Sequence, residues 1–288
     1  MQYRDCYQMG ANKLLAAGVP EAKWDAGLLL EHICHTSRND LLAHGDREVT
    51  ARQLEEYNAA IDLRAGRIPL QQITGEQEFM GLTFQVNEHV LIPRQDTEIL
   101  VEQALKILKP GMRILDMCTG SGCILISLLA FAKGCSGVGV DISGKALAVA
   151  GKNGRRLLGG ADSPDEEAAD RVSWLQSDLF EKVTGAYDVM VSNPPYIPTA
   201  VLDGLMPEVR DHEPVMALDG KEDGLFFYRL IALQAEKYLK PKGYIFFEIG
   251  CEQAEDVSRI LEQNAFEEIE VIKDYAGLHR VVRGRRKE

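Results

Sequence analysis

The chain has 288 residues, of which 45% are hydrophobic and 26% charged, as is typical of a globular protein with one large and one smaller domain. Its net charge of −12 argues against a nucleic-acid substrate, because proteins that bind nucleic acid usually present a basic surface. No apolar run approaches the roughly 18 residues that span a bilayer, and the N-terminus has no apolar signal core, so we expect no membrane association.

The six cysteines and six histidines are scattered, without a Cys-x-x-Cys pair or a histidine cluster. This distribution favours reduced thiols in the cytoplasm and predicts neither a disulfide framework nor a metal site. The last residues, 283–287, are strongly basic. We interpret them as an exposed, solvated chain end, and contact with RNA is the less favoured alternative.

Residues 1–76 predict a small helical domain, with Thr50 and Gln53 forming a capping box at the start of one helix. Residues 77–93 predict a β-hairpin that links this domain to the next, with its turn at Asn87 and Glu88. The third part, residues 94–288, opens with a helix that Asp96 or Thr97 is expected to cap.

From residue 113, strands and helices alternate, which is typical of an α/β fold with a doubly wound parallel sheet. The predicted strands are 114–117, 137–140, 172–175, 189–192 and 244–249, followed by a terminal pair, 270–272 and 280–282, in which the last runs antiparallel. Residues 240–243 predict a turn, and the acidic stretch 159–167 predicts a solvated loop.

A glycine turn and an acid predict a nucleoside site. Gly120 and Gly122 directly follow the first strand, where glycines let the backbone approach a ligand. Asp141 ends the second strand, where an acid can accept both hydroxyls of an adenosine ribose. Past the third strand, Asp178 can meet the adenine amine and Leu179 can cover a ring face, but a turn residue beside a core leucine explains either equally well. The turn has no Lys, so S-adenosyl-L-methionine fits it better than a nucleotide phosphate, with a dinucleotide as the alternative.

The fourth strand ends at Asn193, Pro194, Pro195 and Tyr196. This sequence is similar to the catalytic motif of methyltransferases that act on a planar, weakly nucleophilic nitrogen. The side-chain oxygen of Asn193 and the carbonyl of Pro194 can hold the two N–H groups of such a nitrogen, and Tyr196 can stack on the flat group. An Asn-Pro turn that merely closes a strand is the structural alternative.

Taken together, the chain resembles the bacterial protein-glutamine N5-methyltransferases that modify class-1 peptide-chain release factors. The resemblance covers residues 66–286 and depends on several short segments: 69–75 leading to Phe79, 91–98, 116–122, Asp141, 177–178, 192–197, 217–220 and 247–250. The Asn-Pro-Pro-Tyr sequence alone also occurs in adenine methyltransferases, whereas the segment 92–94 and the helical N-terminal domain are more specific to this family.

The resemblance implies a Rossmann-like class I methyltransferase fold and a substrate, the glutamine of the Gly-Gly-Gln loop of a class-1 release factor. It also implies that the helical domain helps to dock that factor. Asn193, Pro194, Pro195 and Tyr196 would bind the glutamine. The S-adenosyl-L-methionine site would be lined by Cys118, Thr119, Gly120, Ser121, Gly122, Asp141 and Leu179, with Asn193 shared between the two ligands.

Two positions depart from the family pattern. Cys118 stands where the glycine turn usually begins with Gly, which is acceptable only with a negative φ, so we expect a slightly reshaped loop. Gln95 replaces a second proline after Arg94 and loosens that turn.

Two other functions remain to be weighed. A methyltransferase for adenine or guanine amines of DNA or RNA would need a basic groove and a target-recognition segment, which this acidic chain lacks. A non-catalytic binding protein would have no need of Asn193, Tyr196 and Asp141 together. We therefore expect a release factor methyltransferase, acting as a monomer.

Overall fold

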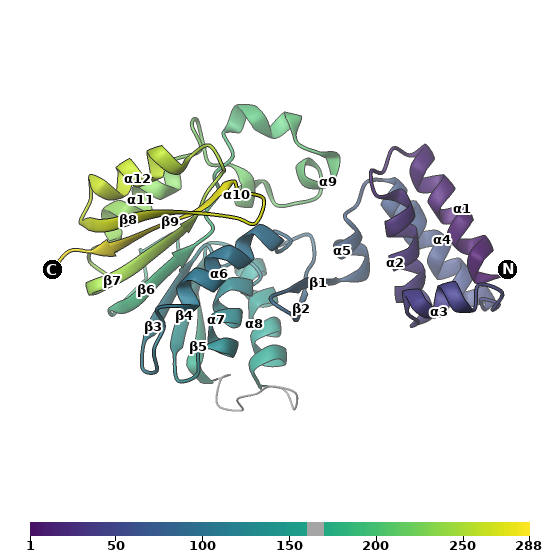
Figure 1. Cartoon of the computed structure of the whole chain (residues 1–288), viewed down its shortest axis with the longest axis horizontal. Helices are drawn as coiled ribbons and strands as arrows, with labels where there is room; N and C mark the ends of the chain where they lie inside the picture. The colour runs from purple at the N-terminus through teal and green to yellow at the C-terminus, as the bar shows by residue number, and fades with distance from the viewer. Residues whose placement is uncertain (160–169) are drawn as a thin grey trace. The chain divides into compact units, whose positions relative to one another are not determined.

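The computed structural model describes residues 1–159 and 170–288, which form two compact units (Figure 1). The first comprises residues 1–76 and 206–212, and the second comprises residues 77–205 and 213–288. Of the acidic stretch predicted as a loop, Gly159 ends a helix and the remainder lies outside the described residues. No helix among the described residues has the length and apolar character needed to cross a bilayer.

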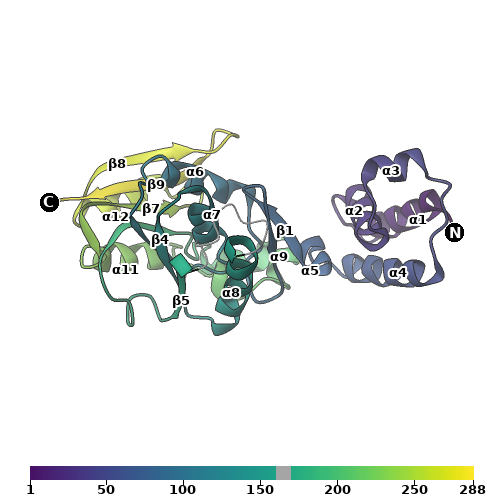
Figure 2. The same ribbon diagram turned by 90° about the horizontal axis from the view of Figure 1, so that it is seen from below.

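The first unit is helical. Its helices are α1 (Tyr3–Ala16), α2 (Ala22–Cys34), α3 (Arg38–Ala43), α4 (Ala51–Ala65) and α5 (Leu70–Thr74). Helices α1, α2 and α4 pack together around a core that includes Leu14, Leu29 and Tyr57 (Figure 2). The Tyr57 hydroxyl donates to the carbonyl of Ala26 at 3.1 Å and so joins α4 to α2. The capping box predicted at Thr50 is confirmed at the start of α4.

Residues 206–212, which include α9 (Pro207–Arg210), belong to this helical unit although they lie far along the chain. Glu208 accepts hydrogen bonds from Arg64 Nη2 at 2.9 Å and from Arg67 Nε at 2.7 Å. Arg64 Nε also donates to Asp25 at 2.7 Å. Burial raises the pKa of Glu208, but its hydrogen bonds with Arg67 and Arg64 outweigh burial and bring the pKa to about 2. We call Asp25, Arg64, Arg67 and Glu208 the Glu208 cluster.

A short β-hairpin opens the second unit, and its turn is not where the sequence analysis placed it. Its strands are β1 (Glu76–Phe79) and β2 (Leu82–Gln85), joined at Met80 and Gly81, both with positive φ. The turn predicted at Asn87 and Glu88 is therefore wrong for the hairpin. The alternating apolar residues that suggested a further strand pack instead against α8 (Gly144–Gly159), where Val90 contacts a small cluster with Val149.

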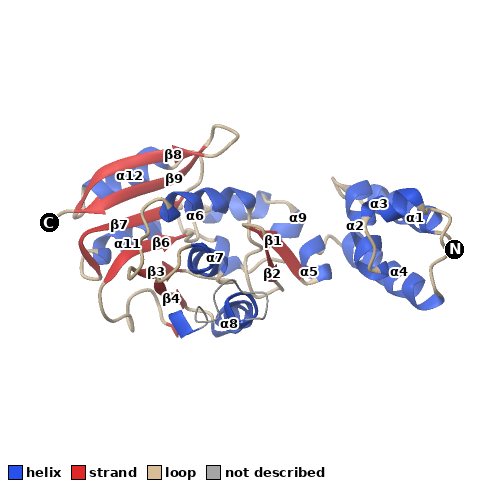
Figure 3. Ribbon diagram, turned by 60° about the horizontal axis from the view of Figure 1, so that its bottom comes forward, coloured by secondary structure: helices blue, strands red, loops and turns tan. Residues whose placement is uncertain are grey.

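A seven-stranded sheet with the order β5-β4-β3-β6-β7-β9-β8 forms the centre of the second unit (Figure 3). The strands are β3 (Arg113–Met117), β4 (Ser136–Asp141), β5 (Val172–Gln176), β6 (Tyr187–Ser192), β7 (Leu239–Glu248), β8 (Phe266–Lys273) and β9 (His279–Arg286). The five strands β5, β4, β3, β6 and β7 are parallel, and β9 runs antiparallel to both β7 and β8. The doubly wound fold is confirmed, and its strand order reverses beside β3, where such sheets bind their ligands.

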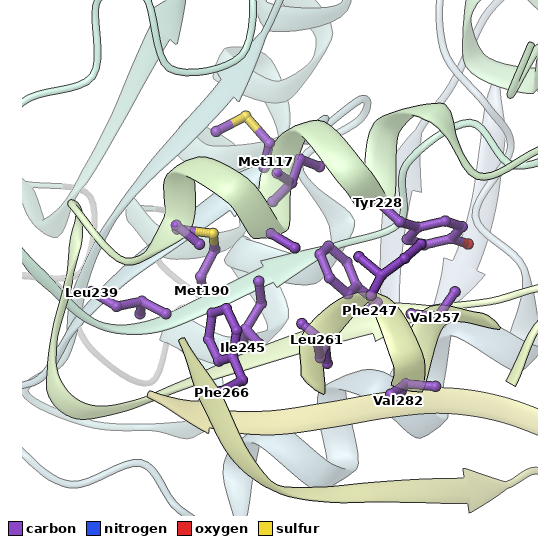
Figure 4. Packing of buried hydrophobic residues seen from close by; sticks show 14 of the residues in the cluster. Met117, Met190, Tyr228, Leu239, Ile245, Phe247, Val257, Leu261, Phe266 and Val282 are labelled. Atoms are coloured by element: carbon purple, nitrogen blue, oxygen red, sulfur yellow. The ribbon is translucent and has the colours of Figure 1, made fainter. Parts of the chain in front are cut away.

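Side chains alternate between the two faces of this sheet. Ile114, Val189 and Phe246 face a cluster built with α6 (Glu98–Leu105), α7 (Cys123–Phe131) and α8. Their chain neighbours, such as Met190 and Phe247, face a second cluster built with α11 (Phe226–Ala235) and α12 (Ala254–Glu262), which Figure 4 shows from close by. Since both faces are covered, the carboxyl edge of the sheet is where the polar ends of the strands meet.

Two predictions near the C-terminus are wrong. The turn predicted at 240–243 lies inside β7, beside an irregularity in its pairing with β6, and Lys240 there binds Asp188 at 2.8 Å. The basic residues 283–286 are not a solvated chain end but part of β9. Arg283 pairs with Glu270 of β8, and Arg285 pairs with Glu267 at 2.8 Å. The positive charge of this run is thus opposed by acidic side chains of the neighbouring strand.

Candidate active site

The loop with the Asn-Pro-Pro-Tyr sequence leaves the sheet at the end of β6. Ser192, the last residue of the strand, pairs in register with Met117 of β3, and its hydroxyl donates to the Met117 carbonyl at 2.6 Å. Strands cannot continue through two prolines, because neither nitrogen can donate to a ladder. Asn193 is therefore the first residue beyond the carboxyl edge, next to the turn that follows β3.

The loop that follows α10 (Val215–Leu218) contacts the Asn-Pro-Pro-Tyr segment and fixes its position. Ile197 pairs with Asp219, just after α10, and the amide of Gly220 donates to the Ile197 carbonyl at 2.8 Å. A Cβ on Gly220 would lie 2.7 Å from backbone atoms of Tyr196, closer than two unbonded atoms can approach. Gln253 Nε2 donates to the Tyr196 carbonyl at 3.0 Å. The path of the Asn-Pro-Pro-Tyr loop is thus determined by contacts on both sides.

The side chain of Asn193 has buried polar partners behind it. Its Nδ2 lies 3.4 Å from the hydroxyl oxygen of Thr97, a residue only 2% exposed. Thr97 and Asn193 both form hydrogen bonds with the carboxyl group of Glu248, the last residue of β7, which is 1% exposed. Burial raises the pKa of Glu248 to about 7, and the hydrogen bond with Thr97, the charge of Arg280 and the hydrogen bond with Asn193 oppose this rise.

Thr97 does not have the local role that the sequence suggested. It ends a 3₁₀ turn, η1 (Gln95–Thr97), and neither Asp96 nor Thr97 caps α6 with its side chain. Asp96 instead pairs with Arg280 at 3.1 Å. The predicted capping is wrong, because long-range partners hold both side chains.

The glycine turn after β3 departs from the expected backbone. Cys118 has φ of 63°, in the left-handed region, so the negative φ expected for it is wrong. A non-glycine residue there costs roughly 1–2 kcal/mol, so the surrounding contacts must hold the turn in place. Thr119 supplies two of them: its amide donates to the Val140 carbonyl at 2.9 Å, and its hydroxyl donates to Asp116 at 2.5 Å.

Asp141 ends β4 and faces this turn. Its two carboxylate oxygens each accept one backbone N–H at 2.9 Å, Oδ2 from Gly120 and Oδ1 from Ser143. Burial raises the pKa of Asp141, and these backbone hydrogen bonds lower it. A carboxylate oxygen can accept more than one hydrogen bond, so both oxygens retain capacity for a bound ligand.

One cavity of about 280 Å³, within the second unit, joins these parts. The predicted residues that line it are Cys118, Thr119, Gly120, Ser121, Asp141, Asp178, Leu179, Asn193 and Pro195. Gly122, Pro194 and Tyr196 do not line it. A Cβ on Gly122 would lie 2.8 Å from the Trp174 ring, so that glycine serves strand–helix packing. Pro194 is buried, and the Tyr196 ring packs against the core cluster beneath the sheet.

Several residues of the site were not identified from the sequence. Thr97 and Arg94 line the cavity, and Arg94 Nη2 donates to both oxygens of the buried Glu213, at 2.7 and 2.9 Å. Glu248 carries a signal that sequence analysis could have used, because it is a charged residue at the carboxyl end of an apolar strand. The described residues include no group of three or more His, Cys, Asp or Glu side chains arranged to hold a metal ion.

Comparisons with known proteins agree with the two units. Residues 5–75 match the family described as the PrmC N-terminal domain, and residues 95–203 match the methyltransferase small domain. A release factor glutamine methyltransferase from Agrobacterium fabrum is 41% identical over 280 residues, 95% of this chain and 94% of that protein. Another from Moorella thermoacetica is 40% identical over the full length of both. A methyltransferase from Pyrococcus furiosus, 15% identical, has the same fold, with a TM-score of 0.54 over 79% of this chain and all of that one. The chain thus belongs to the release factor glutamine methyltransferase family.

Proposed function

We propose that this protein transfers a methyl group from S-adenosyl-L-methionine to the side-chain amide nitrogen of the glutamine in the Gly-Gly-Gln loop of class-1 release factors. The observation that carries the proposal is the position of Asn193, at the wall of the cavity that Asp141 and the glycine turn enclose. An amide acceptor and a nucleoside site therefore share one space.

The residues of the cavity fit the methyl donor. Backbone N–H groups fix the two carboxylate oxygens of Asp141, which can accept hydrogen bonds from the ribose hydroxyls. Asp178 and Leu179 line the same cavity, where they can contact the adenine. Residues 118–121 form the near wall. When bound, S-adenosyl-L-methionine supplies an electrophilic methyl group on a sulfonium.

Asn193 and Pro194 hold and orient the substrate amide. The nitrogen of a carboxamide is weakly nucleophilic, because its lone pair is delocalised into the carbonyl. Acceptance of its two N–H groups by Asn193 Oδ1 and the Pro194 carbonyl directs the lone pair at the methyl group and favours pyramidal nitrogen. As the new N–C bond forms and the S–C bond breaks, the nitrogen becomes acidic and releases a proton to water. No side-chain base is needed. Pro195, which lines the cavity, borders the glutamine side chain in this scheme, and Tyr196, whose ring packs against the core cluster, supports the loop.

The release factor is recognised as a folded protein, and the helical unit helps to dock it. Its PrmC N-terminal domain match supports this part of the proposal. A nucleic-acid substrate has less support, since the basic residues 283–286 are opposed by acidic partners. We infer that the enzyme acts as a monomer in the cytoplasm, where translation takes place.

The test is transfer of labelled methyl to a purified release factor, beside a version with Gln→Ala in its Gly-Gly-Gln loop. We expect label in the first and none in the second. Asn193→Ala should reduce transfer by about 100-fold or more while the enzyme still binds S-adenosyl-L-homocysteine. Labelling of RNA or DNA, and not of the release factor, would overturn the proposal.

A further inference from the structure

An asparagine can assist this reaction in only one orientation. Its side chain has an acceptor end, Oδ1, and a donor end, Nδ2. A substrate amide offers N–H donors, so Oδ1 must face the substrate, and a flipped Asn193 would set donor against donor. Since the two ends have the same shape, packing alone cannot choose between them. Something polar behind Asn193 must make the choice.

Two acceptors lie behind Asn193, and both are fixed by the fold. Thr97 Oγ1 lies 3.4 Å from Nδ2, and the carboxyl group of Glu248 forms hydrogen bonds with both Asn193 and Thr97. Because Phe247 pairs in register with Ser192, the next residues, Glu248 and Asn193, emerge side by side at the sheet edge. The Thr97 hydroxyl can donate to the carboxylate and accept from Nδ2, which completes a three-residue network.

The buried position of Glu248 lowers the stability of the fold. It follows four consecutive strand residues that are apolar, and its Oε2 is buried with no hydrogen-bond partner among the described residues. A buried carboxyl group with an unsatisfied oxygen destabilises a fold, and an apolar side chain of the same volume would not. Stability therefore does not explain it, whereas a requirement for an acceptor behind Asn193 does.

The other charged and titratable groups around Glu248 have different roles. Arg280, on β9, lowers the pKa of Glu248 through its charge, but its guanidinium pairs with Asp96 and Asp274, each at 3.1 Å. The Tyr228 hydroxyl donates to the backbone carbonyl of Glu248 at 2.9 Å, not to its carboxyl group. Burial raises the pKa of Cys123 and of Tyr196, and the charge of Glu248 adds a smaller contribution to both rises.

We propose that Glu248 is a positioning residue which, together with Thr97, holds Nδ2 of Asn193 inward and so presents Oδ1 to the substrate amide. The inference rests on the proposed function. In this role Glu248 takes no proton from the substrate. The N–C bond still forms as the S–C bond breaks, and the proton still goes to water. Its effect is on the orientation of Asn193 and thus on the rate of the methyl-transfer step.

Paired substitutions separate this role from a structural one. Glu248→Leu removes the acceptor, whereas Glu248→Gln keeps one carbonyl oxygen in the same place. Thr97→Val removes the hydroxyl with little change of shape, whereas Thr97→Ser keeps it. Phe246→Leu is the control for lost core packing, because Phe246 lies two residues earlier on the same strand and same face of the sheet but has no polar group.

We expect Glu248→Leu and Thr97→Val to lower kcat by about tenfold or more, since misplacement of an orienting group costs that much. For Glu248→Leu, KM for the release factor and the affinity for S-adenosyl-L-homocysteine should change by less than about threefold, because Glu248, unlike Thr97, does not line the cavity. Glu248→Gln and Thr97→Ser should recover most of kcat, and Phe246→Leu should keep it even where its unfolding temperature is lower.

The measurements are kcat and KM with labelled S-adenosyl-L-methionine and a release factor, together with thermal unfolding. If Glu248→Leu is not folded, the Thr97→Val and Thr97→Ser pair decides the outcome. Equal kcat in Glu248→Leu and wild type, or losses in Glu248→Gln and Thr97→Ser as large as those in their partners, would overturn the positioning role. If the wild type itself labels no release factor, the proposed function has failed, and the role of Glu248 in it fails as well.

Discussion

Gln253 Nε2 lies 3.0 Å from the carbonyl oxygen of Tyr196 and thereby connects the start of α12 to the loop that carries Asn193. The same side chain accepts the amide of Gly250 through Oε1, also at 3.0 Å. One residue therefore satisfies the backbone of two loops at the carboxyl edge of the sheet. Neither loop belongs to a helix or strand that could hold it through regular hydrogen bonding.

We expect Gln253→Ala to lower methyl transfer by about tenfold, because the Tyr196 carbonyl loses its partner and Asn193 its fixed position. Binding of S-adenosyl-L-homocysteine should stay close to that of the wild type, since Gln253 does not line the cavity. Steady-state kinetics and calorimetry measure the two quantities. A parallel loss of both would instead indicate a general collapse of the site.

Gly220→Ala should damage the same loop from the other side. The new Cβ would lie 2.7 Å from the Tyr196 backbone, so the loop must move, and we expect a loss of about 1–3 kcal/mol in the free energy of unfolding. Gly204→Ala is the matched control, since a Cβ there would meet no atom of the described residues within 4 Å. Urea unfolding of both variants tests the difference, and equal losses would contradict it.

Asp116 should make stability depend on pH. It is fully buried, its Oδ1 has no partner among the described residues, and burial raises its pKa from 3.8 to about 7. The folded protein thus keeps this proton to a higher pH than the unfolded chain. This tighter proton binding stabilises the folded protein. The stabilisation is fully present below pH 3.8 and is lost as the pH rises to about 7.

Asp116→Asn removes this dependence. The free energy of unfolding of the variant minus that of the wild type should be larger at pH 8 than at pH 5. This difference should change by at most about 1.4 kcal/mol per pH unit. Comparing wild type and variant at both pH values separates Asp116 from Glu248, whose pKa is also raised to about 7. A stability difference that is the same at pH 5 and pH 8 would show that Asp116 is not the group responsible.

The Glu208 cluster should be needed for the stability of the helical unit. Glu208→Ala leaves Arg64, whose side chain is only 7% exposed, without one of its two carboxylate partners. Loss of one member of a buried ion pair costs about 3–5 kcal/mol. The control is Glu55→Ala on the exposed face of α4, expected within about 0.5 kcal/mol of the wild type. Unfolding followed by tryptophan fluorescence, to which Trp24 in α2 and Trp174 in β5 both contribute, measures both variants.

The sheet and the glycine turn were predictable because their signals are local. Apolar runs such as residues 189–192 report burial directly, and a glycine turn followed by an acid one strand later has a spacing that the fold imposes. Asn193 was identifiable for the same reason, since two prolines stop a strand wherever they occur.

Features that depend on distant partners were not predictable. Thr97 looks like a helix cap in its own segment, and only the return of the chain 96 residues later gives its hydroxyl another partner. The basic residues 283–286 look solvated until Glu267 and Glu270 of the neighbouring strand are placed opposite them. Cys118 has a positive φ because its neighbours hold the turn, which its own residue type disfavours.

The excursion of residues 206–212 into the helical unit has a consequence for how this enzyme can have evolved. The helical unit is discontinuous in sequence, because Glu208 completes a cluster whose other members come from residues 25, 64 and 67. Recombination that exchanged residues 1–76 alone would replace Arg64 and Arg67 without replacing Glu208, the carboxylate that both arginines bind. New specificity in this unit therefore has to arise by substitution, or by the joint inheritance of two separate stretches of the gene.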